Sequence, residues 1–206
     1  MTVGSPKFRV KPTLRGDGVT LRPISADDAR IIRPLLVDPE VLHLTGKVHS
    51  STPTEDDLEE FSLHRLEEIY EWWAEDDLRQ VWVIIDLEQD QIIGEAFLTD
   101  LDEGSNSCSF RIWISRRRDQ GLGTEASLLA LAYAFEEQHV HRVDLEVYDF
   151  NHRARHLYTK LGFVHEGTLR EAMWSDGRWW DAHVMAMLRH EWDALYGREG
   201  ARRSRD

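Results

Sequence analysis

The chain has 206 residues, 41% of them hydrophobic, a formal net charge of -13 and a pI of about 5.2. A chain of this size can bury one sizeable core, which predicts a single domain. The acidic balance argues against a nucleic-acid surface, which needs a basic patch, and favours a cationic substrate or partner, although acidity also serves solubility alone.

The single cysteine, Cys108, excludes an intrachain disulfide and a Cys-x-x-Cys metal or redox site. No apolar run approaches the roughly 18 residues of a spanning helix, and the first ten residues lack the apolar centre of a signal peptide. These features predict a cytoplasmic protein that does not bind a membrane.

The ten histidines do not form a recognisable metal pattern. His139 and His141 sit two apart at a turn, and His152 and His156 sit four apart on a predicted helix without an obvious third ligand. No metal is therefore expected.

Both ends of the chain have the composition of loose segments. Residues 1–15 are predicted to form a flexible arm, and residues 198–206, within "GREGARRSRD", a disordered basic tail. Residues 16–197 are predicted to form the one domain.

The first part of the domain contains one strand and two helices. "GVTLRPI" alternates like a strand, and Ser25–Asp28 then offers a cap for a helix that runs to about Leu42. Thr52 as N-cap, followed by Pro53 at the first helical position, predicts a second helix to about Ala74.

The middle and the end of the chain alternate between strands and helices. "VWVIIDL" and "QIIGEAFLTDL" are predicted to form a hairpin around "EQDQ", and "CSFRIWIS" a third antiparallel strand. After a glycine loop come the helix "EASLLALAYAFEEQ", the strand "RVDLEVY" and the short helix "HRARHLYTKL", with Asn151 as its cap and Gly162 at its end. "FVHEGTLREAMW" and "WWDAHVMAMLRHEW" are two more strands around "SDG". This order predicts a mixed sheet with helices on its faces.

The loop "RRRDQGLGTEA" fits two different cofactor signatures. Gly121, Gly123 and Ala126 match the dinucleotide fingerprint G-x-G-x-x-A, with Glu146 about 20 residues further on. However, five residues separate the preceding strand from Gly121, antiparallel strands come before the loop, and too little chain follows for a second βαβ half. No Gly-Lys-Ser/Thr follows either, which excludes a P-loop.

The remaining interpretation is an anion-binding loop at the start of a helix. Backbone N–H groups from Gln120 to Thr124 would point at an anion on the helix N-terminus. Glycine at positions 121 and 123 lets phosphates approach the backbone without a Cβ in the way.

The C-terminal half resembles the GCN5-related N-acetyltransferase (GNAT) family. The resemblance rests on "RRRDQGLGTEASLLALAYAF", "RVDLEVYDFNHRARHLYTKLGFVHEGTLRE" and "DGRWWDAHVMAMLRHEW", and is strongest to the ribosomal-protein N-terminal and spermidine N-acetyltransferases. With "VTLRPISADDA" it covers nearly all of residues 18–195 and is weakest between His43 and Arg79. It implies an α/β fold with a mostly antiparallel twisted sheet of about seven strands, splayed in the middle and flanked by about four helices.

The resemblance implies acetyl-CoA as cosubstrate, with its pyrophosphate on the backbone of residues 118–124. The arginines at 116–118 would pair with phosphates or are solvated loop charges, and Asn151 would bind pantetheine or only cap its helix. The N–H groups of Trp113 and Ile114 would polarise the thioester carbonyl. The implied cofactor-binding residues are Trp113, Ile114, Arg116, Arg117, Arg118, Gln120, Gly121, Leu122, Gly123, Thr124 and Asn151.

Two residues match the family's catalytic positions. "NHRARHLYTKLGF" fits the family pattern and implies Tyr158 as the general acid that protonates the departing thiolate; the alternative is packing against the cofactor. Asn151 lies seven residues before Tyr158 and shares its helix face. Glu146, twelve residues before Tyr158, is implied as a base that takes a proton from the amine through water; the alternative is a solvated strand residue.

The region before Arg79 carries the strongest charge bias. Between Glu55 and Asp77 there are eleven acids and one base, Arg65. This bias suggests a polyamine, an aminoglycoside-like compound or a protein N-terminus as acceptor, although a solvated acidic face explains it equally well. The tryptophans that could frame an amine, or form the core or a homodimer contact, are Trp72, Trp73, Trp174, Trp179 and Trp180.

Two functions remain open from the sequence. The first is an N-acetyltransferase that moves acetyl from acetyl-CoA to a primary amine in a ternary complex, without Cys108 as nucleophile. The second is a non-catalytic acyl-CoA sensor or regulatory subunit on the same fold. Retention of Tyr158 and Glu146 favours the enzyme, because a binding protein needs neither.

Overall fold

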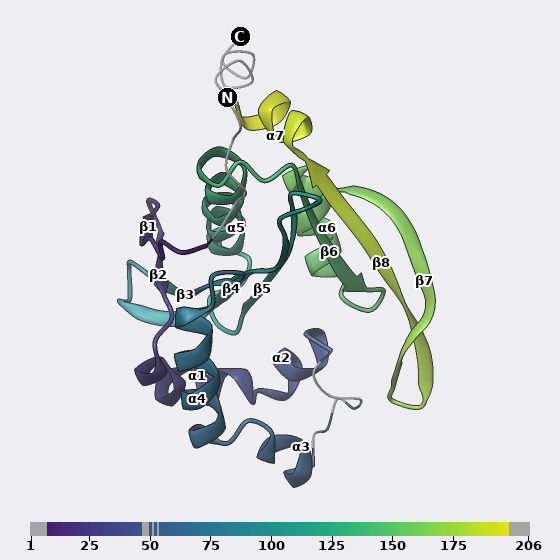
Figure 1. Cartoon of the computed structure of the whole chain (residues 1–206). Helices are drawn as coiled ribbons and strands as arrows, with labels where there is room; N and C mark the ends of the chain where they lie inside the picture. Colours follow the sequence, from purple (N-terminus) through teal and green to yellow (C-terminus); the bar gives the residue numbers. More distant parts are fainter. Residues whose placement is uncertain (1–7, 47–49, 51, 53, 198–206) are drawn as a thin grey trace.

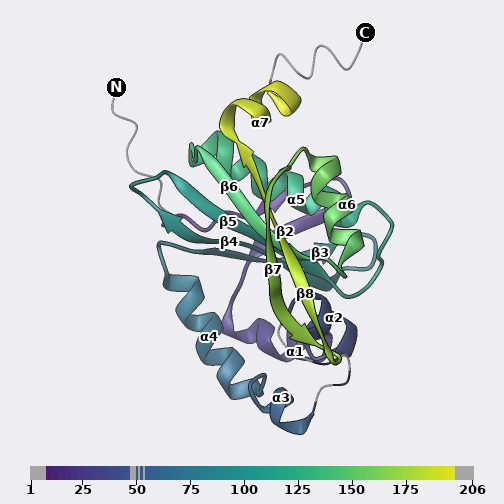
Figure 2. The same cartoon turned by 90° about the vertical axis from the view of Figure 1, so that its right-hand side faces the viewer.

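The computed structural model describes residues 8–46, 50, 52 and 54–197, and it contains one sheet of eight strands in the order β1-β2-β3-β4-β5-β6-β8-β7. Figures 1 and 2 show α5 and α6 on one side of this sheet and α1 and α4 on the other. The strands are β1 (Leu14–Arg15), β2 (Val19–Pro23), β3 (Gln80–Asp86), β4 (Gln91–Asp102), β5 (Ser107–Ile114), β6 (Arg142–Tyr148), β7 (Val164–Ser175) and β8 (Arg178–Leu188). The helices are η1 (Ala26–Asp28), α1 (Ala29–Leu36), α2 (Pro39–Leu44), α3 (Glu55–Glu59), α4 (Leu63–Glu75), α5 (Leu122–Ala132), the π-helical η2 (Tyr133–Glu137), α6 (His152–Leu161) and α7 (Arg189–Tyr196).

The sheet is antiparallel except between β5 and β6, and there it separates. These two strands pair only at Ser107–Ser109 with Arg142–Asp144. Strand β4 nevertheless pairs with β5 as far as Ile114, and β8 pairs with β6 along its whole length. The facing edges of residues 110–114 and 145–148 are therefore without a strand partner in the described part of the chain. We call this opening the β5–β6 gap, and it confirms the expected splay.

Two hydrophobic cores lie on the two faces of the sheet. The core under α5 and α6 includes Phe110 and Tyr158, and the core under α1, α2 and α4 includes Tyr70 and Trp113. Because successive strand residues point to opposite faces, β5 contributes Phe110 to the first core and Trp113 to the second. Together with the β5–β6 gap, this architecture confirms the predicted mixed α/β fold class.

The first predicted helix is interrupted. Its start is confirmed, because Ser25 and Asp28 form a capping box. The helix ends at Leu36 instead of continuing to Leu42. The reason is Pro39, which disfavours a helical conformation at Asp38, and the Asp38 side chain instead accepts a hydrogen bond from the Glu40 amide (2.9 Å) as the N-cap of α2.

The second predicted helix is also two helices, α3 and α4. The break contains Phe61, which is buried, and its carbonyl accepts a 2.7 Å hydrogen bond from Arg33 Nε. The helix is interrupted where the Phe61 ring turns into the core, and α4 begins after Ser62. Pro53, named as the helix start, lies outside the described residues. At the C-terminus, the predicted last strand stops at Leu188, and α7 follows.

The predicted N-terminal arm is wrong over its second half. Phe8 is fully buried, its ring contacts Tyr133 at a centroid distance of 6.0 Å, and its amide donates to Asp77 O at 2.8 Å. Leu14 and Arg15 then form β1, which makes the sheet one strand wider than expected. Residues 1–7 and the predicted tail 198–206 lie outside the described part of the chain.

Replacing Phe8 with alanine should destabilise the fold. Loss of a buried phenylalanine side chain costs about 3 kcal/mol of unfolding free energy, because it removes apolar contacts and leaves a cavity. Thermal or denaturant unfolding measures the effect. Val10→Ala is the matched control because Val10 is 72% exposed. Equal stability of the two variants would mean that residues 8–15 are not part of the domain.

Candidate functional site

The β5–β6 gap presents one backbone donor at the end of β5. The Ser115 amide donates to Ile93 O on β4 at 2.9 Å, so strand alternation turns the Trp113 amide toward β4 as well and the Ile114 amide toward the gap. The Ile114 carbonyl accepts from Arg118 Nε at 2.9 Å. Of the two predicted amide donors, Ile114 therefore faces the gap and Trp113 does not.

The loop between β5 and α5 is shaped to receive an anion. Arg117, Asp119 and Gly121 have positive φ angles of 52°, 64° and 83°. They alternate with Arg118 and Gln120, whose φ angles are not positive. Such alternation turns successive N–H groups to one side and forms an anion-binding concavity. Two non-glycine residues in the left-handed region are uncommon, and such strain concentrates at functional sites.

The start of α5 adds further N–H groups to this loop. The Glu125 amide donates to Gly121 O at 3.0 Å, so the amides of residues 122–124 precede the first intrahelical bond. A Cβ on Gly121 would meet nothing within 4 Å, so glycine is needed there for its φ angle alone. A Cβ on Gly123 would come to 3.3 Å from Ile114 Cδ1, which ties the loop to β5.

The three arginines of the loop differ in their surroundings. Arg117 pairs with Asp86 (2.9 Å) and Glu88 (2.5 Å) on the β3–β4 hairpin. It also donates to the side chain of Gln120 at 2.9 Å. Arg118 binds the Ile114 carbonyl and pairs with Glu40, whereas Arg116 is exposed. Arg117 and Arg118, both predicted phosphate ligands, thus stabilise the conformation of the loop through these contacts.

Asn151 and Glu125 both have structural partners. Asn151 Oδ1 caps α6 by accepting from the Ala154 amide at 3.1 Å, and its Nδ2 donates to Leu44 O on α2 at 3.1 Å. The Glu125 carboxylate accepts from the Gly18 amide at 3.0 Å, away from the anion loop. The capping role of Asn151 is therefore present, and Glu125 ties the start of α5 to the segment before β2.

Tyr158 lies on α6 beside the gap, in the core under α5 and α6. Its ring packs against the rings of Phe110 on β5 and Phe163, at centroid distances of 6.3 Å and 5.8 Å. Burial raises the pKa of the Tyr158 phenol, with the positive charge of Arg111 opposing this shift. The phenol therefore keeps its proton at neutral pH. Burial likewise raises the pKa of the Cys108 thiol, which is thus not a thiolate.

Glu146 lies on the other side of the sheet. It is exposed, whereas its neighbours Leu145 and Val147 are buried in the core that contains Tyr158. Alternation along β6 therefore turns Glu146 to the face that carries Trp113. Tyr158 and Glu146 flank the β5–β6 gap from opposite faces, close to the strands that diverge.

The structure adds a buried carboxylate that the sequence analysis did not single out. Glu95 on β4 is 2% exposed, and its Oε2 accepts from the Trp113 indole Nε1 at 2.9 Å. It faces a cavity of about 160 Å³. The signal in the sequence is an acid within the apolar strand "QIIGEAFL". The residues around the cavity are Leu36, Glu60, Phe61, Arg65, Leu66, Ile69, Tyr70, Trp73, Glu95 and Phe97; we call it the Glu95 cavity.

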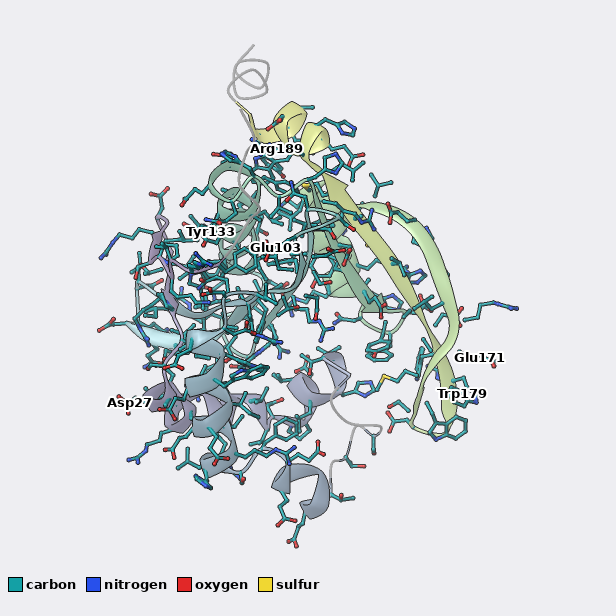
Figure 3. The ribbon with its side chains drawn as sticks, viewed as in Figure 1. Asp27, Glu103, Tyr133, Glu171, Trp179 and Arg189 are labelled. Carbon is teal, nitrogen blue, oxygen red and sulfur yellow. The ribbon has the colours of Figure 1, made fainter. Side chains whose placement is uncertain are left out.

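The five tryptophans proposed to frame an amine do not gather at one place. Trp73 borders the Glu95 cavity, while Trp72 is exposed. Trp174 and Trp179 are exposed and contact each other at 5.4 Å on the β7–β8 hairpin. Figure 3 shows Trp179 near the end of this hairpin, away from the side chains around Tyr133. Trp180 packs under Arg178, with the guanidinium 3.4 Å from the ring centroid.

The described residues offer neither a metal-binding cluster nor a membrane-spanning helix. They contain no group of three or more His, Cys, Asp or Glu side chains placed to hold a metal ion. Among the helices of this part of the chain, none has the length and apolar character needed to cross a membrane.

Comparison with known proteins agrees with this geometry. The model of the acetyltransferase (GNAT) domain matches residues 19–164. An uncharacterized N-acetyltransferase of the SPbeta prophage from Bacillus subtilis is 28% identical over 88% of this chain and 96% of its own length. The spermidine N(1)-acetyltransferase of Vibrio cholerae is 33% identical over 64% of this chain and 76% of its own length.

A ribosomal protein uS5-alanine N-acetyltransferase from Escherichia coli is 30% identical over 53% of this chain and 57% of its own length. The crystal structure of the Vibrio cholerae spermidine N-acetyltransferase with CoA and spermine superposes with a TM-score of 0.74 at 28% identity, over 86% of this chain and 99% of the other. The chain therefore belongs to the GNAT family and is an N-acetyltransferase that uses acetyl-CoA.

Proposed function

We propose that the protein acetylates a primary amine of a cationic acceptor by direct attack in a ternary complex. The observation that carries this proposal is the β5–β6 gap, which has the anion loop at one end, Tyr158 on one face and Glu146 on the other. Cys108 is buried and its thiol keeps its proton, so it is not a nucleophile that could carry the acyl group. The acceptor amine attacks the acyl carbon from the side of Glu146.

The gap and the loop fit the two ends of acetyl-CoA, an elongated molecule with a diphosphate. The amides of residues 118–124 would hold the diphosphate, and the open edge of β5 offers main-chain groups to the pantetheine arm, as an exposed strand edge does to a peptide. The cosubstrate supplies an acyl group activated as a thioester. The Ile114 amide is the donor that would polarise its carbonyl.

The transfer needs protons to leave the nitrogen and one to reach the sulfur. The amine is mostly an ammonium ion at neutral pH, and Glu146 would take one of its protons through a water molecule. The nitrogen then forms its bond to the acyl carbon, and it loses a second proton to water as the carbon–sulfur bond breaks. Tyr158 would give its proton to the sulfur, since its raised pKa keeps that proton available, and the phenol would then regain a proton from solvent.

The class of acceptor is inferred from charge and from relatives. The net charge is -13, and the region from Glu55 to Asp77 has eleven acids. An acidic surface concentrates cations near it. The relatives from Vibrio cholerae and Escherichia coli are acetyltransferases of spermidine and of a ribosomal protein. We favour a polyamine or an aminoglycoside-like amine, with a protein N-terminus as the second candidate.

Self-association is proposed on separate grounds. The Vibrio cholerae spermidine N-acetyltransferase has a dodecameric structure, which superposes with a TM-score of 0.69 at 28% identity. Trp174 and Trp179 are exposed on the β7–β8 hairpin, and large aromatic side chains are enriched at protein interfaces. We propose a homodimer as the basic unit.

Tyr158→Phe should separate acid catalysis from packing. Removal of the hydroxyl should lower kcat about 100-fold, while the Kd for acetyl-CoA stays within about twofold, because the ring contacts remain. Release of free CoA thiol with a panel of polyamines, aminoglycosides and peptides gives the rate, and calorimetry gives the Kd. An equal loss of binding would reassign Tyr158 to packing. Tight CoA binding by the wild type without turnover on any amine would favour a sensor.

Glu146→Gln should make the rate depend more strongly on pH. Below the pKa of the amine most acceptor is protonated and needs a base, so the loss there should be about 100-fold, and it should shrink as the pH approaches that pKa. A pH–rate profile on one amine measures this. Glu137→Gln is the control, since Glu137 is exposed at the far end of the α5 region. An unchanged profile for Glu146→Gln would remove it as the base.

Gly121→Ala should weaken CoA binding about tenfold through backbone geometry alone. Its φ angle of 83° disfavours a Cβ, while the added atom meets nothing within 4 Å. Gly177→Ala is a closely matched control, because Gly177 has a φ angle of 79°, equally open surroundings and a place in the β7–β8 turn. Calorimetric titration with CoA distinguishes the two. Equal affinities in both variants would mean that the loop is not the diphosphate site.

A further inference from the structure

The Glu95 cavity contains a carboxylate on the acceptor side of the sheet. Glu95 lies directly opposite Trp113 in the β4–β5 pairing, so both side chains point to the face covered by α1 and α4. This is also the face to which Glu146 points. The carboxylate is buried, and the approximately 160 Å³ cavity beside it holds a few non-hydrogen atoms.

The carboxylate is bonded to one side chain and lies near another. The Trp113 indole donates to Oε2 at 2.9 Å. The Tyr70 phenol is close enough that its pKa is raised by burial and then by the negative charge of Glu95. A carboxylate in an apolar setting interacts strongly with any cation that reaches it, because the surroundings screen the charge less than water does.

The walls of the Glu95 cavity suit a methylene chain that carries such a cation. Trp73 and Phe97 meet edge to face at 5.8 Å, and Trp73 contacts Tyr70 at 5.5 Å. Aromatic faces attract ammonium groups and also bury apolar carbon. Arg65 borders the cavity from α4, and Glu60 borders it from the segment before α4.

The Glu95 cavity lies close to the β5–β6 gap. Trp113 is on β5, which borders the gap, and Glu95 is on the next strand. Neighbouring strands lie about 4.8 Å apart, so Glu95 is roughly 10 Å from the middle of the gap. An acceptor with two amines joined by a few carbon atoms spans this distance.

We propose that the Glu95 cavity binds the second, non-reacting ammonium group of a diamine or polyamine acceptor, with Glu95 as its counter-charge. Glu95 is then a specificity-determining residue that selects acceptors with two positive charges. The inference rests on the proposed function, since it assumes that the reacting amine enters the gap from the Glu146 side. The indole of Trp113, bonded to Glu95, forms the boundary between the two positions.

Matched amines test the proposal. With CoA present, 1,5-diaminopentane should bind the wild-type protein about 10- to 100-fold more tightly than n-pentylamine, because only the diamine supplies a second charge for a charge-assisted hydrogen bond. Titration calorimetry measures both Kd values without turnover. In the acetylation assay, the same preference should appear in KM.

Glu95→Gln keeps the shape of the side chain and removes its charge. It should abolish the preference for the diamine and leave n-pentylamine within about twofold. Glu137→Gln, an equal charge change on an exposed side chain at the far end of the α5 region, should leave both amines unchanged. A wild-type protein without diamine preference overturns the proposal, and so does a Glu95→Gln variant that keeps the preference or weakens both amines equally.

Different outcomes would contradict the proposed function and the proposed role of the Glu95 cavity. Selective binding of the diamine without acetylation of any amine would contradict the proposed function and support the cavity. Acetylation of both amines at equal kcat/KM, with equal Kd values, would support the function and contradict the cavity. If Glu95→Gln does not fold, the wild-type comparison of the two amines decides alone.

Discussion

The site depends on a defect in the sheet that its surroundings keep open. Unpaired main-chain donors and acceptors inside a fold are costly, and adjacent strands normally pair along their length. Strands β5 and β6 cannot close, because β5 follows β4 as far as Ile114 while β6 follows β8 along its whole length. The two halves of the sheet therefore diverge after Ser109, and the opening remains available to an extended ligand that brings its own hydrogen-bonding groups.

The same divergence explains why the two proton-transfer residues come from different layers. Tyr158 belongs to the core under α5 and α6, and Glu146 projects from the opposite face of β6. One side of the opening is dry and apolar, which suits a group that must keep its proton. The other side faces solvent and acidic helices, which suits arrival of a charged amine and departure of a proton.

Sequence patterns predicted the parts governed by local rules. The strand alternation, the Ser25–Asp28 cap and the glycine loop all follow from residues close together in the chain. The break in the predicted acidic helix was missed, because Phe61 is buried in a core built from distant segments and its carbonyl accepts a hydrogen bond from Arg33 of α1. Glu95 was missed for the same reason: strand spacing gives its side, but its contact with Trp113 requires the register of two strands. The arm was misjudged because Phe8 finds its pocket far away, against Tyr133.

Helix α2 is held at both ends by two of the residues that the family resemblance assigned to cofactor binding. Arg118 reaches Glu40 in its first turn, and Asn151 reaches the carbonyl of Leu44 at its last residue. His43 between them stacks on Phe150 at 4.5 Å. A ligand that displaced the anion loop would therefore also act on α2 and, through it, on the start of α6, and any coupling that this produced between two ligands would be equal in both directions.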